Sequence, residues 1–135
     1  MRRRNTGFTL IELLLVMVIL VVLAAVVVPK FTGRSEQARQ TAAKTDITVI
    51  DAAIDQFEID TGRYPTSEEG LAALIAAPTG VTNWRGPYLK RASIPTDPWG
   101  NPYVYKYPGT HNPNGADLSS TGPDGREGND DIVNW

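Results

Sequence analysis

A continuous apolar run near the N-terminus constrains this chain more than any other feature. Residues 8–28 form a run of 21 residues in which Glu12 is the one charged side chain. As a helix rising about 1.5 Å per residue, this run would be roughly 32 Å long, enough to cross a hydrocarbon core of about 30 Å. Arg2, Arg3 and Arg4 precede it. Because basic residues stay on the cytoplasmic side, we predict a single-pass anchor with the rest of the chain outside the cytoplasm.

Two simpler interpretations of this run are a secretory signal and an uncleaved signal anchor. A secretory signal has an apolar core of about 7–15 residues that ends at a small-residue cleavage site, so it fits poorly. A plain anchor fits better but does not explain Glu12, since a carboxylate in a membrane span costs on the order of a few kcal/mol. Glu12 should therefore either have a partner or extend to the lipid headgroups.

The remainder of the chain has the composition of one small acidic domain. The 135 residues are 41% hydrophobic and include no cysteine, which excludes disulfides. Without the three N-terminal arginines, ten basic residues face fifteen acidic ones, a net charge of −5. An acidic body of this kind argues against nucleic acid as a partner.

The helical pattern continues beyond the apolar run. Apolar residues recur there at spacings of three and four: Ala43, Ile47, Ile50, Ile54 and Phe57. This stripe predicts a helix that packs one face on a core and ends near Gly62. Pro29 lies inside the long pattern and predicts a kink, because proline removes one intrahelical hydrogen bond.

The C-terminal half predicts a small antiparallel sheet. Thr66 and Glu69 form a T-x-x-E capping box before a short helix that Pro78 should end. Alternation predicts a strand over residues 103–107, with further strands over residues 117–121 and at the C-terminus. The expected fold is therefore α+β, a long N-terminal helix packed on a small antiparallel sheet.

Residues 122–131, GPDGREGNDD, contain almost nothing apolar. Acidic side chains so close together repel one another unless a cation lies between them, and Ca²⁺ prefers carboxylate and carbonyl oxygens. The spacing is not that of an EF-hand. The pattern alone leaves two alternatives open, a metal-binding loop and a solvated acidic turn.

Residues 7–12, GFTLIE, follow a short basic leader and precede a long apolar run. This arrangement resembles the class III signal of type IV pilins and pseudopilins. The resemblance implies that residues 1–7 are a leader that a prepilin peptidase removes between Gly7 and Phe8, and that the new amine of Phe8 is methylated. It also implies an assembly role for Glu12. A carboxylate from a neighbouring subunit can neutralise the ammonium at Phe8, since an unpaired buried charge costs far more than a paired one.

Two further segments are similar to motifs of the major pseudopilin of type II secretion. They are residues 62–66, GRYPT, continued by residues 69–71, and residues 97–103, DPWGNPY. The resemblance implies that residues 8–30 are first a transmembrane helix and then the filament core, and that residues 31–135 form a periplasmic domain. It also implies a homopolymer that joins other pseudopilins on an inner-membrane assembly platform and drives export of folded proteins across the outer membrane.

The same resemblance implies a calcium site in the acidic segment. Its ligands would be the side chains of Asp124 and Asp131 and the backbone carbonyls of Thr121 and Arg126. Asp130 lies beside Asp131 and could replace it. Trp99, between rigid prolines, is expected to pack against the sheet and to take no part in chemistry.

Two alternative functions remain to be compared. A type IV pilin for adhesion, motility or DNA uptake would share the N-terminal half, but many such pilins close their C-terminal region with a disulfide, which this chain cannot form. A membrane-anchored periplasmic enzyme would need catalytic groups. His111 is the single histidine, it lies in a turn, and no nucleophile or phosphate-binding motif is present. We therefore expect a structural subunit and no catalysis.

Overall fold

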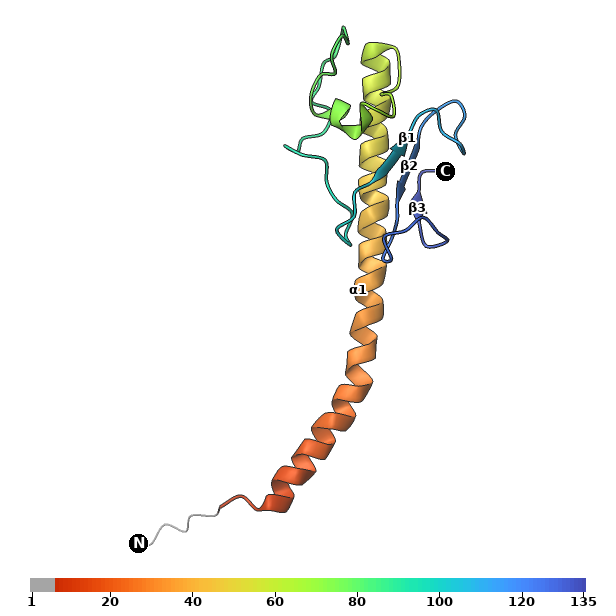
Figure 1. The fold of residues 1–135 in the computed structure, drawn as a ribbon. Helices are drawn as coiled ribbons and strands as arrows, with labels where there is room; N and C mark the ends of the chain where they lie inside the picture. The colour runs from red at the N-terminus through yellow and green to blue at the C-terminus, as the bar shows by residue number, and fades with distance from the viewer. Residues whose placement is uncertain (1–6) are drawn as a thin grey trace, which may run out of the picture. The chain divides into compact units, whose positions relative to one another are not determined.

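The computed structural model describes residues 7–135, with the backbone alone described at residues 27–32. Its elements in chain order are a long helix, a 3₁₀ helix and three short strands (Figure 1). They are α1 (Leu10–Thr61), η1 (Gly70–Leu74), β1 (Val104–Lys106), β2 (Asp117–Ser120) and β3 (Ile132–Val133). The chain divides into two compact units, Met1–Gln37 and Ala38–Trp135. The predicted α+β fold, a long helix with a small antiparallel sheet, is confirmed.

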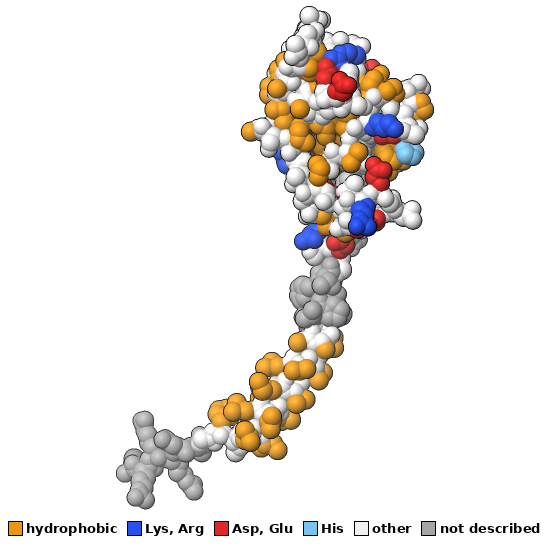
Figure 2. Space-filling model, viewed as in Figure 1, with side chains coloured by type: hydrophobic (Ala, Val, Ile, Leu, Met, Phe, Trp, Pro, Cys, Tyr) orange, Lys and Arg blue, Asp and Glu red, His pale blue; other side chains and the backbone are white. Residues whose placement is uncertain are grey.

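The N-terminal unit carries the first part of α1, whose side chains from Leu10 to Val26 are apolar apart from Glu12. Its large hydrophobic side chains are exposed, from Phe8 at 79% to Val26 at 60% (Figure 2). Within the described residues, no helix combines the length and the hydropathy needed to cross a membrane. The backbone stays helical through Pro29. The predicted kink falls on residues 27–32, whose side chains lie outside the described set, and it stays a prediction.

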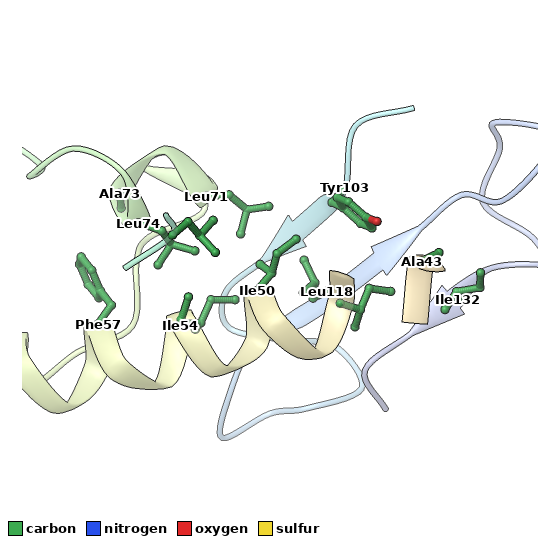
Figure 3. Close-up of a cluster of buried hydrophobic side chains, with 13 residues drawn as sticks. Ala43, Ile50, Ile54, Phe57, Leu71, Ala73, Leu74, Tyr103, Leu118 and Ile132 are labelled. Carbon is green, nitrogen blue, oxygen red and sulfur yellow. The ribbon is translucent and has the colours of Figure 1, made fainter. Parts of the chain in front are cut away.

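The C-terminal unit is built on the predicted apolar stripe of α1. All five stripe residues are buried, with Ala43 and Phe57 fully inaccessible. Other elements and connecting segments contribute the remaining large side chains of this core (Figure 3). They include Leu71, Leu74, Leu89, Tyr103, Leu118 and Ile132. The helix ends at Thr61, directly before Gly62, whose φ of 76° lies in the left-handed region that favours glycine. The predicted stripe and helix end are both confirmed.

The sheet has the order β1-β2-β3, with antiparallel pairing throughout. Val104 pairs with Ser119 in the first ladder, and Ser120 pairs with Ile132 in the second. The central strand β2 is buried along its whole length. The predicted strands over residues 103–107 and 117–121 are therefore confirmed, although each observed strand is shorter by one or two residues. Trp99, which was expected to pack against the sheet, is half-buried and packs against the core cluster.

The predicted short helix is different from the observed one. The structure has a 3₁₀ helix, η1, which ends before Ile75 and so does not extend to Pro78. The capping bonds do form: the Thr66 N–H donates to Glu69 Oε2 at 2.8 Å, and the Glu69 N–H donates to Thr66 Oγ1 at 3.2 Å. However, Gly70 has a φ of 56°, which an α-helix cannot accommodate. The Thr66–Glu69 pair therefore closes a turn that leads into η1.

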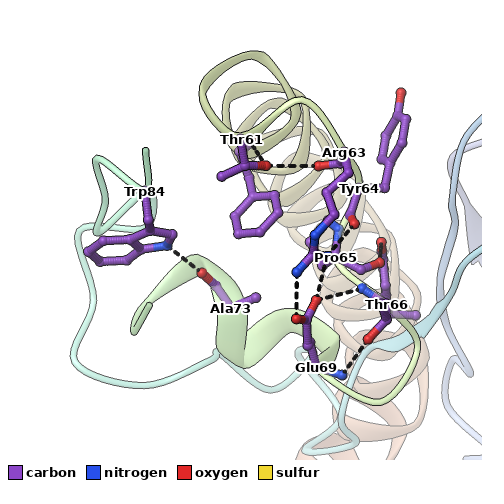
Figure 4. A network of polar contacts seen from close by, with 10 residues as sticks. Thr61, Arg63, Tyr64, Pro65, Thr66, Glu69, Ala73 and Trp84 are labelled. Atoms are coloured by element: carbon purple, nitrogen blue, oxygen red, sulfur yellow. Dashed lines mark hydrogen bonds and ion pairs between the residues drawn. The ribbon is translucent and has the colours of Figure 1, made fainter. Parts of the chain in front are cut away.

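An ion pair between Arg63 and Glu69 connects the Thr66–Glu69 turn to the segment that directly follows α1 (Figure 4). Arg63 donates from Nη1 to Glu69 Oε2 at 2.7 Å and from Nη2 to Glu69 Oε1 at 2.6 Å. The same Nη1 donates to the carbonyl of Tyr64 at 2.9 Å. The hydrogen bonds from Arg63, with the backbone N–H of Thr66, lower the pKa of Glu69 from 4.5 to about 2.

Replacing Glu69 with glutamine should lower the free energy of unfolding by about 1 kcal/mol at pH 7, because a bidentate but partly exposed ion pair is lost. The folded pKa of Glu69 lies below its ordinary value of 4.5, so its stabilisation is complete above pH 4.5 and disappears as the pH falls toward 2. Urea unfolding of both proteins at a series of pH values measures this difference. A difference that stays constant down to pH 2, or one that the exposed-residue control Glu68→Gln reproduces, would contradict the assignment.

Candidate functional site

The N-terminal site is organised around the first turn of α1. The N–H and the hydroxyl of Thr9 both donate to Glu12 Oε2, each at 3.0 Å. The Glu12 N–H donates back to Thr9 Oγ1 at 3.3 Å. This is a capping box, and it explains why the helix begins at Leu10. This capping box is not among the features predicted from the sequence, although residues 9–12 read T-x-x-E.

The predicted cleavage site lies directly outside this cap. Gly7 and Phe8 precede the helix, and Phe8 is 79% exposed. No atom lies within 4 Å of the position that a Cβ on Gly7 would take. The peptide bond between Gly7 and Phe8 is therefore in a non-helical and accessible segment, as a peptidase requires.

The predicted metal site lies in the segment between β2 and β3. Asp124 Oδ1 accepts a hydrogen bond from the N–H of Arg126 at 2.9 Å. Asp131 Oδ1 accepts one from the N–H of Gly128 at 3.1 Å. Each of the two predicted side-chain ligands thus closes a tight turn through its Oδ1. The Oδ2 atom of each carboxylate takes no part in that hydrogen bond.

Two glycines show where Asp130 lies in this segment. A Cβ on Gly122 would be 2.9 Å from the Asp130 carbonyl oxygen and 3.2 Å from Asp130 Oδ2. A Cβ on Gly128 would be 3.3 Å from Asp130 Oδ1 and 3.8 Å from the Arg126 carbonyl oxygen. The carboxylate of Asp130 and the Arg126 carbonyl, one of the predicted ligands, therefore both lie near Gly128, and a side chain at Gly122 or Gly128 would crowd Asp130.

The chemistry of these donors fits calcium. Every candidate atom is a carboxylate or carbonyl oxygen, and Ca²⁺ takes six to eight such ligands in flexible geometry. Among the residues that the structure describes, no three acidic or histidine side chains gather closely enough to hold a metal ion. The shell that the resemblance implies contains two carboxylates and completes itself with backbone carbonyls.

The single histidine, His111, contacts the C-terminal residue Trp135 and the buried Asp117. The His111 ring stacks on Trp135, with centroids 4.2 Å apart and planes 4° from parallel. Its Nδ1 lies 3.2 Å from Asp117 Oδ2. The carboxylate of Asp117 also accepts the N–H groups of Thr110, His111 and Asn112 at 2.7–2.9 Å. Burial raises the pKa of Asp117, but these backbone hydrogen bonds outweigh it and the pKa is lowered. The arrangement orders a turn and the chain end.

Two family models match the chain, one after the other. The prokaryotic N-terminal methylation motif matches residues 2–28, and the family described as type II secretion system protein G matches residues 30–135. Together they account for the apolar N-terminal segment and for the folded C-terminal unit.

Curated relatives and a solved structure agree with these matches. The type II secretion system core protein G of Pseudomonas aeruginosa is 51% identical over 99% of this chain and 97% of its own length. The protein of the same name from Aeromonas hydrophila is 45% identical over 99% of this chain and 94% of its own length. The crystal structure of the major pseudopilin from the type 2 secretion system of enterohaemorrhagic Escherichia coli superimposes with a TM-score of 0.67 at 37% identity, covering 81% of this chain and 96% of that one.

Proposed function

This chain belongs to the type II secretion system protein G family, the major pseudopilins, and we propose that it polymerises into a periplasmic filament that drives export of folded proteins across the outer membrane. The observation that carries the proposal is the contrast between the two units. Apart from Glu12, the side chains of α1 from Leu10 to Val26 are apolar and exposed, whereas the C-terminal unit has a closed core of its own.

The exposed first part of α1 needs an apolar environment, because contiguous apolar surface in water is unfavourable. We place it first in the inner membrane, as a single-pass anchor with the domain over residues 31–135 in the periplasm. Removal of residues 1–7 by prepilin peptidase and methylation of Phe8 precede assembly. In the filament, contacts with other copies replace the lipid contacts, and the assembly platform and other pseudopilins are the expected partners.

Deleting the gene tests this function directly. Loss of folded exoproteins from the medium, with surface pili unchanged, is the expected result. Unchanged secretion with missing pili or lost motility would instead identify a type IV pilin and would overturn the proposal. Complementation with the intact gene controls for effects on neighbouring genes.

We also propose that the acidic segment binds one calcium ion. Asp124 and Asp131 would supply carboxylate ligands and Thr121 and Arg126 would supply carbonyls, with Asp130 as the alternative to Asp131. The support is the donor chemistry and the position of Asp130 and the Arg126 carbonyl, which both lie near Gly128. Bound calcium would remove the repulsion between the acids and connect the two ends of a segment that has almost no apolar side chains to pack.

Calcium should raise the melting temperature of the C-terminal unit by about 10 °C or more. A ligand at 100 times its dissociation constant adds about 2.7 kcal/mol, and each kcal/mol shifts the melting of a domain this size by roughly 4–8 °C. Circular dichroism of the full chain in detergent, with calcium and then with chelator, measures the shift, and magnesium is the control ion. Asp124→Asn should abolish the shift, and comparison of Asp130→Asn with Asp131→Asn identifies the second ligand. Melting curves that do not respond to calcium would refute the site.

A further inference from the structure

The turn over residues 97–101 is closed by a buried aspartate. Asp97 is 3% exposed, and its Oδ1 accepts the N–H of Trp99 at 3.1 Å and the N–H of Asn101 at 2.7 Å. The Asp97 N–H donates to the Asn101 carbonyl at 2.8 Å. These internal hydrogen bonds hold the turn in one conformation, so the side chains of Asp97 and Asn101 have defined positions.

From this turn, two hydrogen-bonded connections reach one residue of the acidic segment, Gly122. The Ser120 hydroxyl donates to Asp97 Oδ2 at 2.6 Å, and Ser120 Oγ accepts the Gly122 N–H at 3.2 Å. Asn101 Nδ2 donates to the Gly122 carbonyl at 3.0 Å. Both backbone polar groups of Gly122 are therefore bonded to the network.

These two bonds determine the orientation of the peptide groups on either side of Gly122. A peptide group is planar, so the N–H of Gly122 and the carbonyl of Thr121 lie in one plane and point in opposite directions. The bond from Gly122 to Ser120 therefore sets the direction of the Thr121 carbonyl. The bond from Asn101 sets the next peptide group, which leads toward Asp124. The Asn101 side chain also lies close to Gly125, since its Oδ1 would be 3.2 Å from a Cβ on Gly125.

We propose that Ser120 and Asn101 are positioning residues for the calcium loop, and that Asp97 holds both in place. The inference rests on the calcium site proposed above and extends it to residues outside the loop. Ser120 is fully buried and Thr121 and Gly122 are buried, so water does not compete for these bonds. Partners behind the ligands of metal sites typically contribute about 10–100-fold to metal affinity.

Calorimetric titration of the full chain in detergent with calcium chloride tests the inference. Asn101→Ala should weaken calcium binding by about 10–100-fold. Asn112→Ala is the matched control, because Asn112 Nδ2 also donates to a backbone carbonyl, that of Ala116 at 3.2 Å, in a different turn. The control should change the affinity by less than about twofold. If Asn101 had a purely structural role, Asn101→Ala would lower the calcium-free melting temperature and leave the calcium affinity unchanged, which would overturn the inference.

Hydrogen exchange in the unsubstituted protein gives a second measurement that does not depend on a variant folding. Because coupling is reciprocal, calcium should slow exchange at the amides of Trp99, Asn101 and Gly122. The amide of Tyr107, bonded to Ser67 Oγ at 2.9 Å, is the control and should not respond. Calcium binding without protection of the turn would overturn the positioning role and leave the calcium site standing. Absence of binding in the titration would overturn both.

Discussion

Replacing Phe57 with alanine should lower the free energy of unfolding of the C-terminal unit by about 3–5 kcal/mol. Phe57 is fully buried, and its ring meets that of Tyr88 edge-on at 5.8 Å. The guanidinium of Arg63 lies over the Phe57 ring, 5.8 Å from its centroid. Truncation would therefore remove apolar burial, leave a cavity and release the ion-paired turn that follows the helix.

Denaturant unfolding of the full chain in detergent, followed by the near-ultraviolet signal of the tryptophans, measures this loss. Ile59→Ala is the matched control, because Ile59 lies two residues away on the same helix and is 73% exposed. It should change the free energy of unfolding by less than about 0.5 kcal/mol. A loss below about 1 kcal/mol for Phe57→Ala, or equal losses for the two variants, would show that the apolar stripe of α1 is not what holds the unit together.

The elements that could be predicted from the sequence are those whose cause is periodic and local. The stripe from Ala43 to Phe57 repeats with the period of a helix, so its burial follows from the pattern. The alternation over residues 103–107 predicts β1 for the same kind of reason. A left-handed glycine ends the long helix in the position where a helix stop was expected.

The features that could not be predicted depend on a single backbone angle or on contacts between distant residues. The T-x-x-E pattern at Thr66 indicates an α-helix, and only the positive φ of Gly70 shows that a turn and a 3₁₀ helix follow instead. The hydrogen bond from Asn101 to Gly122 joins residues 21 positions apart, and no periodic pattern marks it. The ligand roles within residues 121–131 came from the family resemblance, since an acidic glycine-rich segment alone is compatible with a solvated turn.

Glu12→Gln should leave membrane insertion intact and reduce filament yield by about 100-fold or more. Removing one partner of a buried ion pair costs about 3–5 kcal/mol per subunit, and about 1.4 kcal/mol is a tenfold change in equilibrium. Quantitative immunoblotting of sheared filaments measures yield, and alkaline extraction of membranes measures insertion. Glu68→Gln, which removes one exposed acidic charge from the C-terminal unit, is the control.

The capping box at the start of α1 makes this experiment specific. In the structure Glu12 accepts the N–H and hydroxyl of Thr9, so any substitution there could in principle act by unravelling the first turn. Glutamine also serves as the third helical residue of a capping box, and its side-chain oxygen can accept the same bonds. The substitution therefore keeps the helix start and removes the negative charge. Loss of filaments would then be due to the missing charge, as pairing with the amine of Phe8 in a neighbouring subunit requires. Normal filament yield from Glu12→Gln would show that the carboxylate serves only its own helix.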